Sequence, residues 1–115
     1  MDLPSPLPPP LVDYIAERFK AMSDPTRIRI LDRLRDGERS VSELTAELGG
    51  SQQNISKHLV TLHRDGILGR RKQGNRVIYW IADESVLDLC EHVCGSFERR
   101  VAELRDVIDP DSRAA

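Results

Sequence analysis

A change in hydrophobic periodicity at Gly66 constrains the fold of this chain more than any other feature. Before Gly66, apolar residues recur at helical spacing in four segments, and the last two of these are short and meet at Gly49-Gly50. After it, residues 67–72 and 76–82 are rich in strand-forming side chains and flank a polar tip. A long amphipathic segment, about 84–107, completes the pattern. We therefore predict a mainly α fold with a small β-hairpin.

The segments before Gly66 begin and end at recognisable signals, and we predict helices over about residues 11–22, 25–35, 42–48 and 52–65. Asp24 and Ser51 are good N-caps, Ser42 opens the third helix, and Asp83 is the expected cap of the last one. The first of these helices carries one apolar stripe, made of Leu11, Ile15, Phe19 and Met22. In the other three, the apolar positions expected to face inward are Ile28, Leu31, Leu34, Val41, Leu44, Leu48, Ile55, Leu59 and Leu62. Two short helices joined at glycines and followed by a hairpin indicate a winged helix-turn-helix, in the order α-α-α-α-β-β-α.

The chain of 115 residues is expected to form one domain over residues 11–107. Residues 1–10 contain five prolines and are predicted to be a disordered arm, and residues 108–115 a flexible tail. The sequence has neither a long apolar run nor the pattern of a secretion signal, so we expect a cytoplasmic protein with no membrane partner.

The apolar stripes of the first and last helices have too few partners in a chain this small. The stripe of the last helix consists of Val86, Cys90, Val93, Phe97, Val101 and Leu104. We therefore expect a homodimer joined through the first and last helices, with Phe19, Val93, Phe97 and Val101 at the centre of its interface.

The net charge of −2 conceals a basic centre between two acidic flanks. Residues 51–80 carry six basic side chains and one acidic side chain, whereas residues 1–50 and 81–115 are both net negative. A local basic stripe of this kind suits a surface that faces phosphates, although a solvated charged surface is the plainer reading of charge alone.

The basic centre coincides with the second helix of the helix-turn-helix and with the hairpin. Glutamine side chains can bond adenine in the major groove, lysine can bond guanine, and a basic hairpin can follow the DNA backbone or the minor groove. Ser51 and the free amides at the start of its helix could hold a phosphate. The candidate DNA-binding residues are Ser51, Gln52, Gln53, Asn54, Ser56, Lys57, Arg70, Arg71, Lys72, Asn75 and Arg76.

Three segments make the chain resemble the ArsR/SmtB-type winged-helix repressors. Residues 21–31 (AMSDPTRIRIL) resemble the start of the family's second helix, 51–59 (SQQNISKHL) its recognition helix, and 71–79 (RKQGNRVIY) its wing. The resemblance covers about residues 11–105. It implies a homodimeric repressor that binds an imperfect inverted repeat and is released by an effector.

The resemblance also lets the family's metal sites be checked by position. One site needs thiolates where this chain has Ser40 and Ser42, and the other falls on Asp83, Ser85, Ser96 and Arg99, of which only Asp83 could ligate a cation. Neither standard pattern is present.

Cys90 and Cys94 remain as candidate metal or metalloid ligands, or as redox-sensitive thiols. They are four residues apart on one helix face, but they also lie on an apolar stripe, where a free cysteine commonly packs in a core. No cofactor is indicated with certainty. His58 and His63 are expected near DNA or in packing, and His92 on the surface.

Other function classes remain for comparison. An enzyme is disfavoured because Cys90 and His92 point in different directions from their helix, and because no phosphate-binding loop or paired carboxylates are present. A winged helix that binds protein is disfavoured by the basic tip. A DNA-binding regulator that has lost its metal sensor and is controlled by a partner protein is the main alternative.

Overall fold

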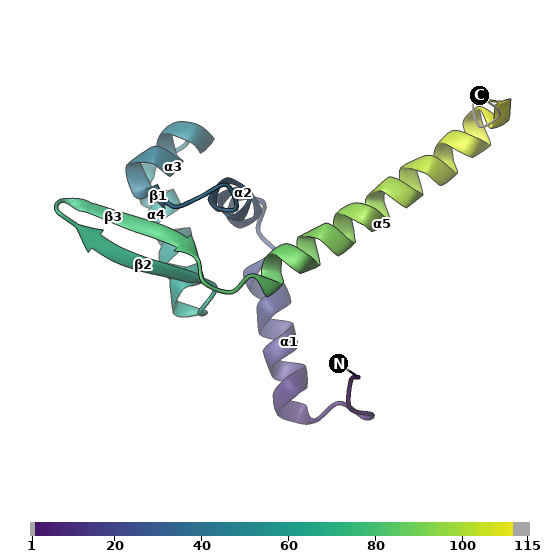
Figure 1. Cartoon of the computed structure of the whole chain (residues 1–115), viewed down its shortest axis with the longest axis horizontal. Helices are drawn as coiled ribbons and strands as arrows, with labels where there is room; N and C mark the ends of the chain where they lie inside the picture. Colours follow the sequence, from purple (N-terminus) through teal and green to yellow (C-terminus); the bar gives the residue numbers. More distant parts are fainter. Residues whose placement is uncertain (1, 112–115) are drawn as a thin grey trace.

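A computed structural model describes residues 2–111 and confirms a winged helix-turn-helix (Figure 1). Five helices and three strands occur in these residues. They are α1 (Pro9–Ala21), α2 (Pro25–Leu34), β1 (Arg39–Ser40), α3 (Val41–Leu48), α4 (Gln52–Arg64), β2 (Leu68–Gln73), β3 (Arg76–Ile81) and α5 (Ser85–Ile108).

Two helices, α1 and α3, start at other residues than the sequence predicts. Helix α1 begins at Pro9, so the prediction that residues 1–10 lack regular structure is wrong for Pro9 and Pro10. A proline fits the first turn of a helix, where its missing N–H needs no partner. Helix α3 is capped by Ser40 rather than opened at Ser42: the Ser40 hydroxyl accepts from the Glu43 amide, and the Glu43 carboxylate accepts from the Ser40 amide.

The third strand, β1, was not predicted, because two residues are too short to show a period. β1 pairs antiparallel with β3, and β3 pairs antiparallel with β2, in the order β1-β3-β2. Gly69 of β2 faces Trp80 of β3, and a Cβ at Gly69 would lie only 2.4 Å from the Trp80 ring. The absence of a side chain at Gly69 therefore lets the indole cross β2.

One aliphatic cluster holds α2, α3, α4 and the sheet together. Its most completely buried side chains are Ile30, Leu31, Leu44, Leu59, Leu62, Ile67, Leu68 and Val86. The predicted inward face of α4 is confirmed by the burial of Ile55, Leu59 and Leu62. For α2 the prediction is wrong at Ile28, which is 44% exposed, while Ile30 takes a core position.

Arg18 connects α1 to the ends of two other elements. Its guanidinium donates to the Asp65 carbonyl at the end of α4 (2.7 Å) and to the Tyr14 hydroxyl (2.9 Å), and it lies 3.6 Å from the Asp83 carboxylate. Asp83 stands one residue before the N-cap of α5, which is Glu84 rather than the predicted Asp83. Hydrogen bonds from Ser85 lower the pKa of Asp83 despite its partial burial.

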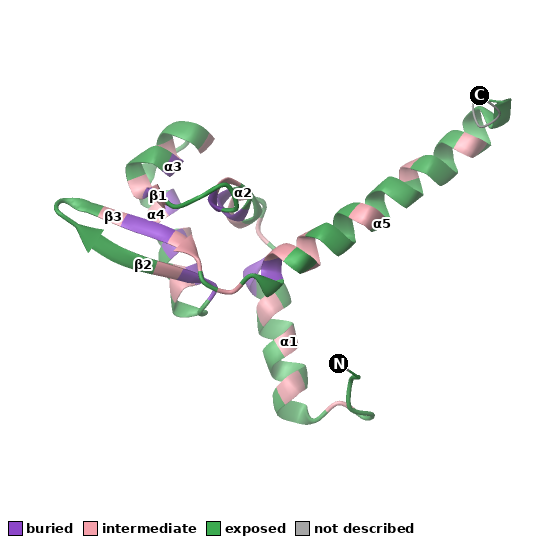
Figure 2. Ribbon diagram, viewed as in Figure 1, coloured by how far each residue is buried: buried purple, intermediate pink, exposed green. Residues whose placement is uncertain are grey.

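Helices α1 and α5 project from this body instead of folding back onto it (Figures 1 and 2). The Cα radius of gyration is 18.2 Å, whereas a compact chain of this length would have roughly 13 Å. Large apolar side chains lie exposed along the projecting helices, among them Phe19, Val93, Phe97, Leu104 and Ile108. Within residues 2–111, no helix has the length and apolar character needed to span a bilayer.

Candidate nucleic-acid interface

Helix α4 presents a polar face to solvent at its N-terminal end. Its buried side packs into the core, while Gln52, Gln53, Asn54 and Lys57 are exposed and Ser56 is half-buried. The Ser51 hydroxyl accepts from the Asn54 amide at 3.1 Å, which fixes the first turn and leaves other amides at the helix start open to a ligand. The polar residues that are predicted to contact DNA on this helix are therefore accessible, with Ser56 partly so.

Two histidines fix α4 to its surroundings. The Arg27 side chain donates to the His58 ring at 3.2 Å and also to the Ala21 carbonyl at 3.0 Å. The His63 ring bonds the Leu68 carbonyl at the start of β2 (2.9 Å). These contacts identify His58 and His63 as packing groups that set the position of α4.

Asp24 lies near the other nitrogen of the His58 ring, opposite the one that Arg27 contacts. Its carboxylate caps α2 and lies 3.8 Å from the His58 ring. Burial alone would raise the pKa of Asp24, but hydrogen bonds from the amides of Arg27 and Thr26 outweigh it and lower the pKa. The capping carboxylate is therefore held in its charged form beside α4.

The strand register divides the basic residues of the wing between two faces of the sheet. Directly paired residues in antiparallel strands share a face, and successive residues alternate. Arg70 pairs with Tyr79, and Lys72 pairs with Val77, on the face that continues into the core. Both cations line a hollow of about 440 Å³ together with Arg71 and with Ser56 and Val60 of α4. This face brings wing cations beside the polar helix.

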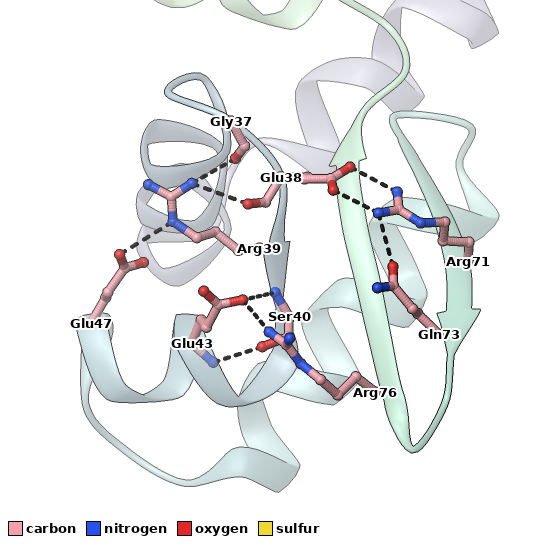
Figure 3. Close-up of polar contacts among 9 residues, drawn as sticks. All are labelled: Gly37, Glu38, Arg39, Ser40, Glu43, Glu47, Arg71, Gln73 and Arg76. Carbon is pink, nitrogen blue, oxygen red and sulfur yellow. Dashed lines mark hydrogen bonds and ion pairs between the residues drawn. The ribbon is translucent and has the colours of Figure 1, made fainter.

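The opposite face carries Arg71, Gln73 and Arg76, and its arginines are already occupied (Figure 3). The Arg71 guanidinium donates to both carboxylate oxygens of Glu38 at 2.6 and 2.7 Å and contacts Gln73 at 3.2 Å. Arg76 donates to Glu43 at 2.7 Å.

The contacts of these side chains also shift their pKa values. The hydrogen bond from Arg71 lowers the pKa of Glu38, and the same bond raises that of Arg71. The Ser40 amide, more than Arg76, lowers the pKa of Glu43. Sequence reasoning did not single out Glu38 or Glu43, because both are 33 residues from their arginines and no local pattern joins them.

Cys90 and Cys94 lie where α5 passes α2. Both line a groove of about 570 Å³ against α2 and a second, apolar groove of about 620 Å³ that reaches α1. Cys90 is half-buried, and burial raises the pKa of its thiol; Cys94 is exposed, with its Sγ 3.9 Å from Glu98. Among residues 2–111 of a single subunit, no three histidine, cysteine or acidic side chains gather as a metal site.

A short helix-turn-helix whose second helix exposes a polar, hydrogen-bonding face beside a basic wing defines the class of winged-helix DNA-binding regulators. The family model of the helix-turn-helix domain matches residues 22–70. The chain is 41% identical over 81 residues to the HTH-type transcriptional regulator Rv0081 of Mycobacterium tuberculosis, covering 70% of this chain and 71% of the relative. It is 34% identical over 93 residues to the HTH-type transcriptional repressor SmtB of the same organism, covering 77% and 69%.

Solved structures agree with the sequence relatives. The crystal structure of Rv0081 superposes with a TM-score of 0.73 at 35% identity, over 84% of this chain and 97% of that one. The homodimeric winged helix-turn-helix domain of Mb0332 from Mycobacterium bovis, a possible ArsR-family regulator, gives 0.71 at 31% identity, over 81% and 86%. The chain belongs to the ArsR/SmtB family of winged helix-turn-helix transcriptional regulators, and the relatives named above are regulators and not enzymes.

We predict that substitutions at Ser51 separate helix stability from DNA contact. Ser51→Ala removes the cap and should lower the free energy of unfolding by roughly 0.5–2 kcal/mol in thermal or urea denaturation. Ser51→Asp keeps a capping oxygen and should preserve stability, yet it should weaken DNA binding because it places a negative charge at the helix start. Equal DNA affinity of Ser51→Asp and the parent would show that DNA does not approach this end of α4.

Proposed function

We propose that the protein is a homodimeric transcriptional repressor that binds an inverted-repeat operator, with one α4 in each half-site. The observation that carries the proposal is the hollow between α4 and the wing, which Ser56 and Val60 of the helix line together with the wing cations Arg70, Arg71 and Lys72. The polar side chains of Gln52, Gln53 and Lys57 are exposed on the same helix. A major groove accepts a helix of this kind, and phosphates flank that groove.

The side chains on this surface divide into two roles. We assign Gln52, Gln53 and Ser56 to base edges, and Asn54 lies at the same end of the helix. Lys57, Arg70 and Lys72 are cations for the backbone, with Ser51 and Asn75 at the two ends of the surface. Arg71 and Arg76, predicted for the same role, contact carboxylates in the free chain, so their contribution depends on exchange of partners.

The dimer is proposed through α1 and α5, with a second copy of the chain covering the apolar groove between them. Phe19, Ile28, Val93 and Phe97 line this groove, and its exposed walls are almost wholly apolar. In a single chain with a radius of gyration of 18.2 Å, the projecting helices leave their large apolar side chains exposed, and a second copy would cover them. The homodimeric state of the Mb0332 domain supports self-association of this chain. A two-fold axis would then place the two α4 helices about 34–36 Å apart.

Substitutions on the DNA surface should have two different effects. Lys72→Gln should weaken binding to every duplex and reduce the salt slope of the binding constant by about 1 per subunit. Gln53→Ala should instead relax base preference at one position of each half-site, by about 1–3 kcal/mol. Fluorescence anisotropy with a selected operator and its point variants measures both effects.

Arg100→Gln removes the same charge from α5 and serves as the control, with no change expected. If Lys72→Gln matched this control, and Gln53→Ala left base preference intact, the surface would be assigned wrongly.

The dimer interface is tested at Phe97, which is 68% exposed in the single chain. Phe97→Asp should convert dimers to monomers in light scattering at micromolar concentration, because it places a charge at the centre of the apolar face. Ala102→Asp adds the same charge on another face of α5 and should stay dimeric. A folded monomer from the parent chain would contradict the proposed assembly.

For the effector, we propose that a soft metal or metalloid acts at Cys90 and Cys94, which line the groove that the partner subunit would cover. Two thiols at this spacing can both bond one arsenic atom, with loss of two protons, and further ligands can come from His92, a carboxylate or the second subunit. Control by a partner protein is the competing proposal, since neither standard family metal site is present in the sequence.

A trivalent arsenical distinguishes these two proposals. Phenylarsine oxide should form two As–S bonds with Cys90 and Cys94, release water, and dissociate the parent from its operator. The Cys90→Ser/Cys94→Ser variant should fold and bind the operator normally but should not respond. If both proteins respond equally, or neither responds, direct thiol control is wrong.

A further inference from the structure

The outer face of the sheet holds two arginines of the wing in ion pairs with carboxylates from outside the wing. Glu38 precedes β1, and Glu43 lies in the first turn of α3. Arg71 is bonded by both oxygens of Glu38, which is the fork geometry that guanidinium also adopts with a phosphate. Figure 3 shows both pairs on the same side of the hairpin. The carboxylates therefore occupy the positions in which a DNA phosphate would bind these arginines.

The fold does not depend on either pair. Glu43 is already held by the Ser40 amide and hydroxyl, so α3 is capped without Arg76. Every side chain in the two pairs is between 43% and 54% exposed. Exposed ion pairs contribute little to stability, and their partners exchange readily with solution anions.

The cations on the other face have no such restraint. Among the described residues, no ion pair or hydrogen bond is formed by the side chains of Arg70 or Lys72. The wing thus offers two free cations beside α4 and two neutralised ones on its outer face.

We propose that Glu38 and Glu43 are internal competitors of DNA phosphates for Arg71 and Arg76, and that they restrain the affinity of the wing for DNA. The proposal rests on the DNA-binding function proposed above. DNA gains the two outer contacts only by displacing a carboxylate at each. The restraint acts on backbone contacts, so it lowers affinity for all sequences and leaves base preference unchanged.

The experiment measures binding to a duplex without an operator as a function of salt concentration, for Glu38→Gln, Glu43→Gln and the double variant. Glutamine has nearly the same shape and can still serve in the capping box at position 43. Each variant should bind several-fold more tightly at low salt. The slope of log K against log salt should steepen by about 0.9 for each arginine that gains a phosphate.

Asp36→Asn is the matched control. It removes the same charge two residues from Glu38, and no ion pair or hydrogen bond of the Asp36 side chain occurs among the described residues. A general change in the electrostatic field would affect this control and Glu38→Gln equally, whereas release of Arg71 would affect only Glu38→Gln. As a second test, Arg71→Gln should cost more affinity in the Glu38→Gln background than in the parent.

The possible outcomes distinguish a failure of this inference from a failure of the proposed DNA-binding function. If the parent binds no DNA, the proposed function fails. If the parent binds DNA and the glutamine variants match Asp36→Asn, competition is wrong. If the glutamine variants bind more weakly than the parent, the pairs support the wing instead, and competition is again wrong.

Discussion

The arrangement of the molecule depends on the burial of one aliphatic cluster where α2, α3, α4 and the sheet meet. Leu44, Leu59 and Leu62 have no exposed surface, and Ile67 and Leu68 join them directly after α4 ends. Because these side chains fill one space, α4 and the first residue of the wing are fixed by the same packing. The hydrogen bonds of the His58 ring with Arg27 and of the His63 ring with the Leu68 carbonyl further fix the orientation of α4.

This shared packing gives the DNA surface its geometry. α4 uses one side for the core, so its polar residues must face solvent, and β2 leaves the core at Leu68 with Arg70 and Lys72 on the face toward α4. The alternation of a strand puts Arg71 on the outer face, where it pairs with Glu38, although it also borders the hollow beside α4. The wing is basic on both faces, but carboxylates neutralise only the outer one. Its charge is therefore directed toward the helix that would read DNA.

The projecting helices leave large apolar side chains exposed in a single chain. α5 contributes Val86 to the core and then continues outward with most of its apolar stripe exposed. Arg18 bonds the end of α4 and lies beside Asp83, which stands between β3 and α5. The two projecting helices are thus joined to α4 by polar contacts as well as by Ala21, Met22 and Val86 in the core. In the proposed dimer, a change in the pairing of α1 and α5 would reach α4 through these contacts.

The sequence by itself determined the order of the elements, the inward faces of α4 and the polar face that it exposes, since each depends on periodicity and capping within a few residues. It could not show β1, which is too short to have a period, nor the true starts of α1 and α3, where proline and the Ser40–Glu43 capping box define the boundary. It also placed Arg70, Arg71, Lys72 and Arg76 in one group. Only the tertiary structure separated these cations into two faces. Glu38 and Glu43 are each 33 residues from the arginine that they contact, so strand register decides the charge pairing and no local sequence pattern can show it.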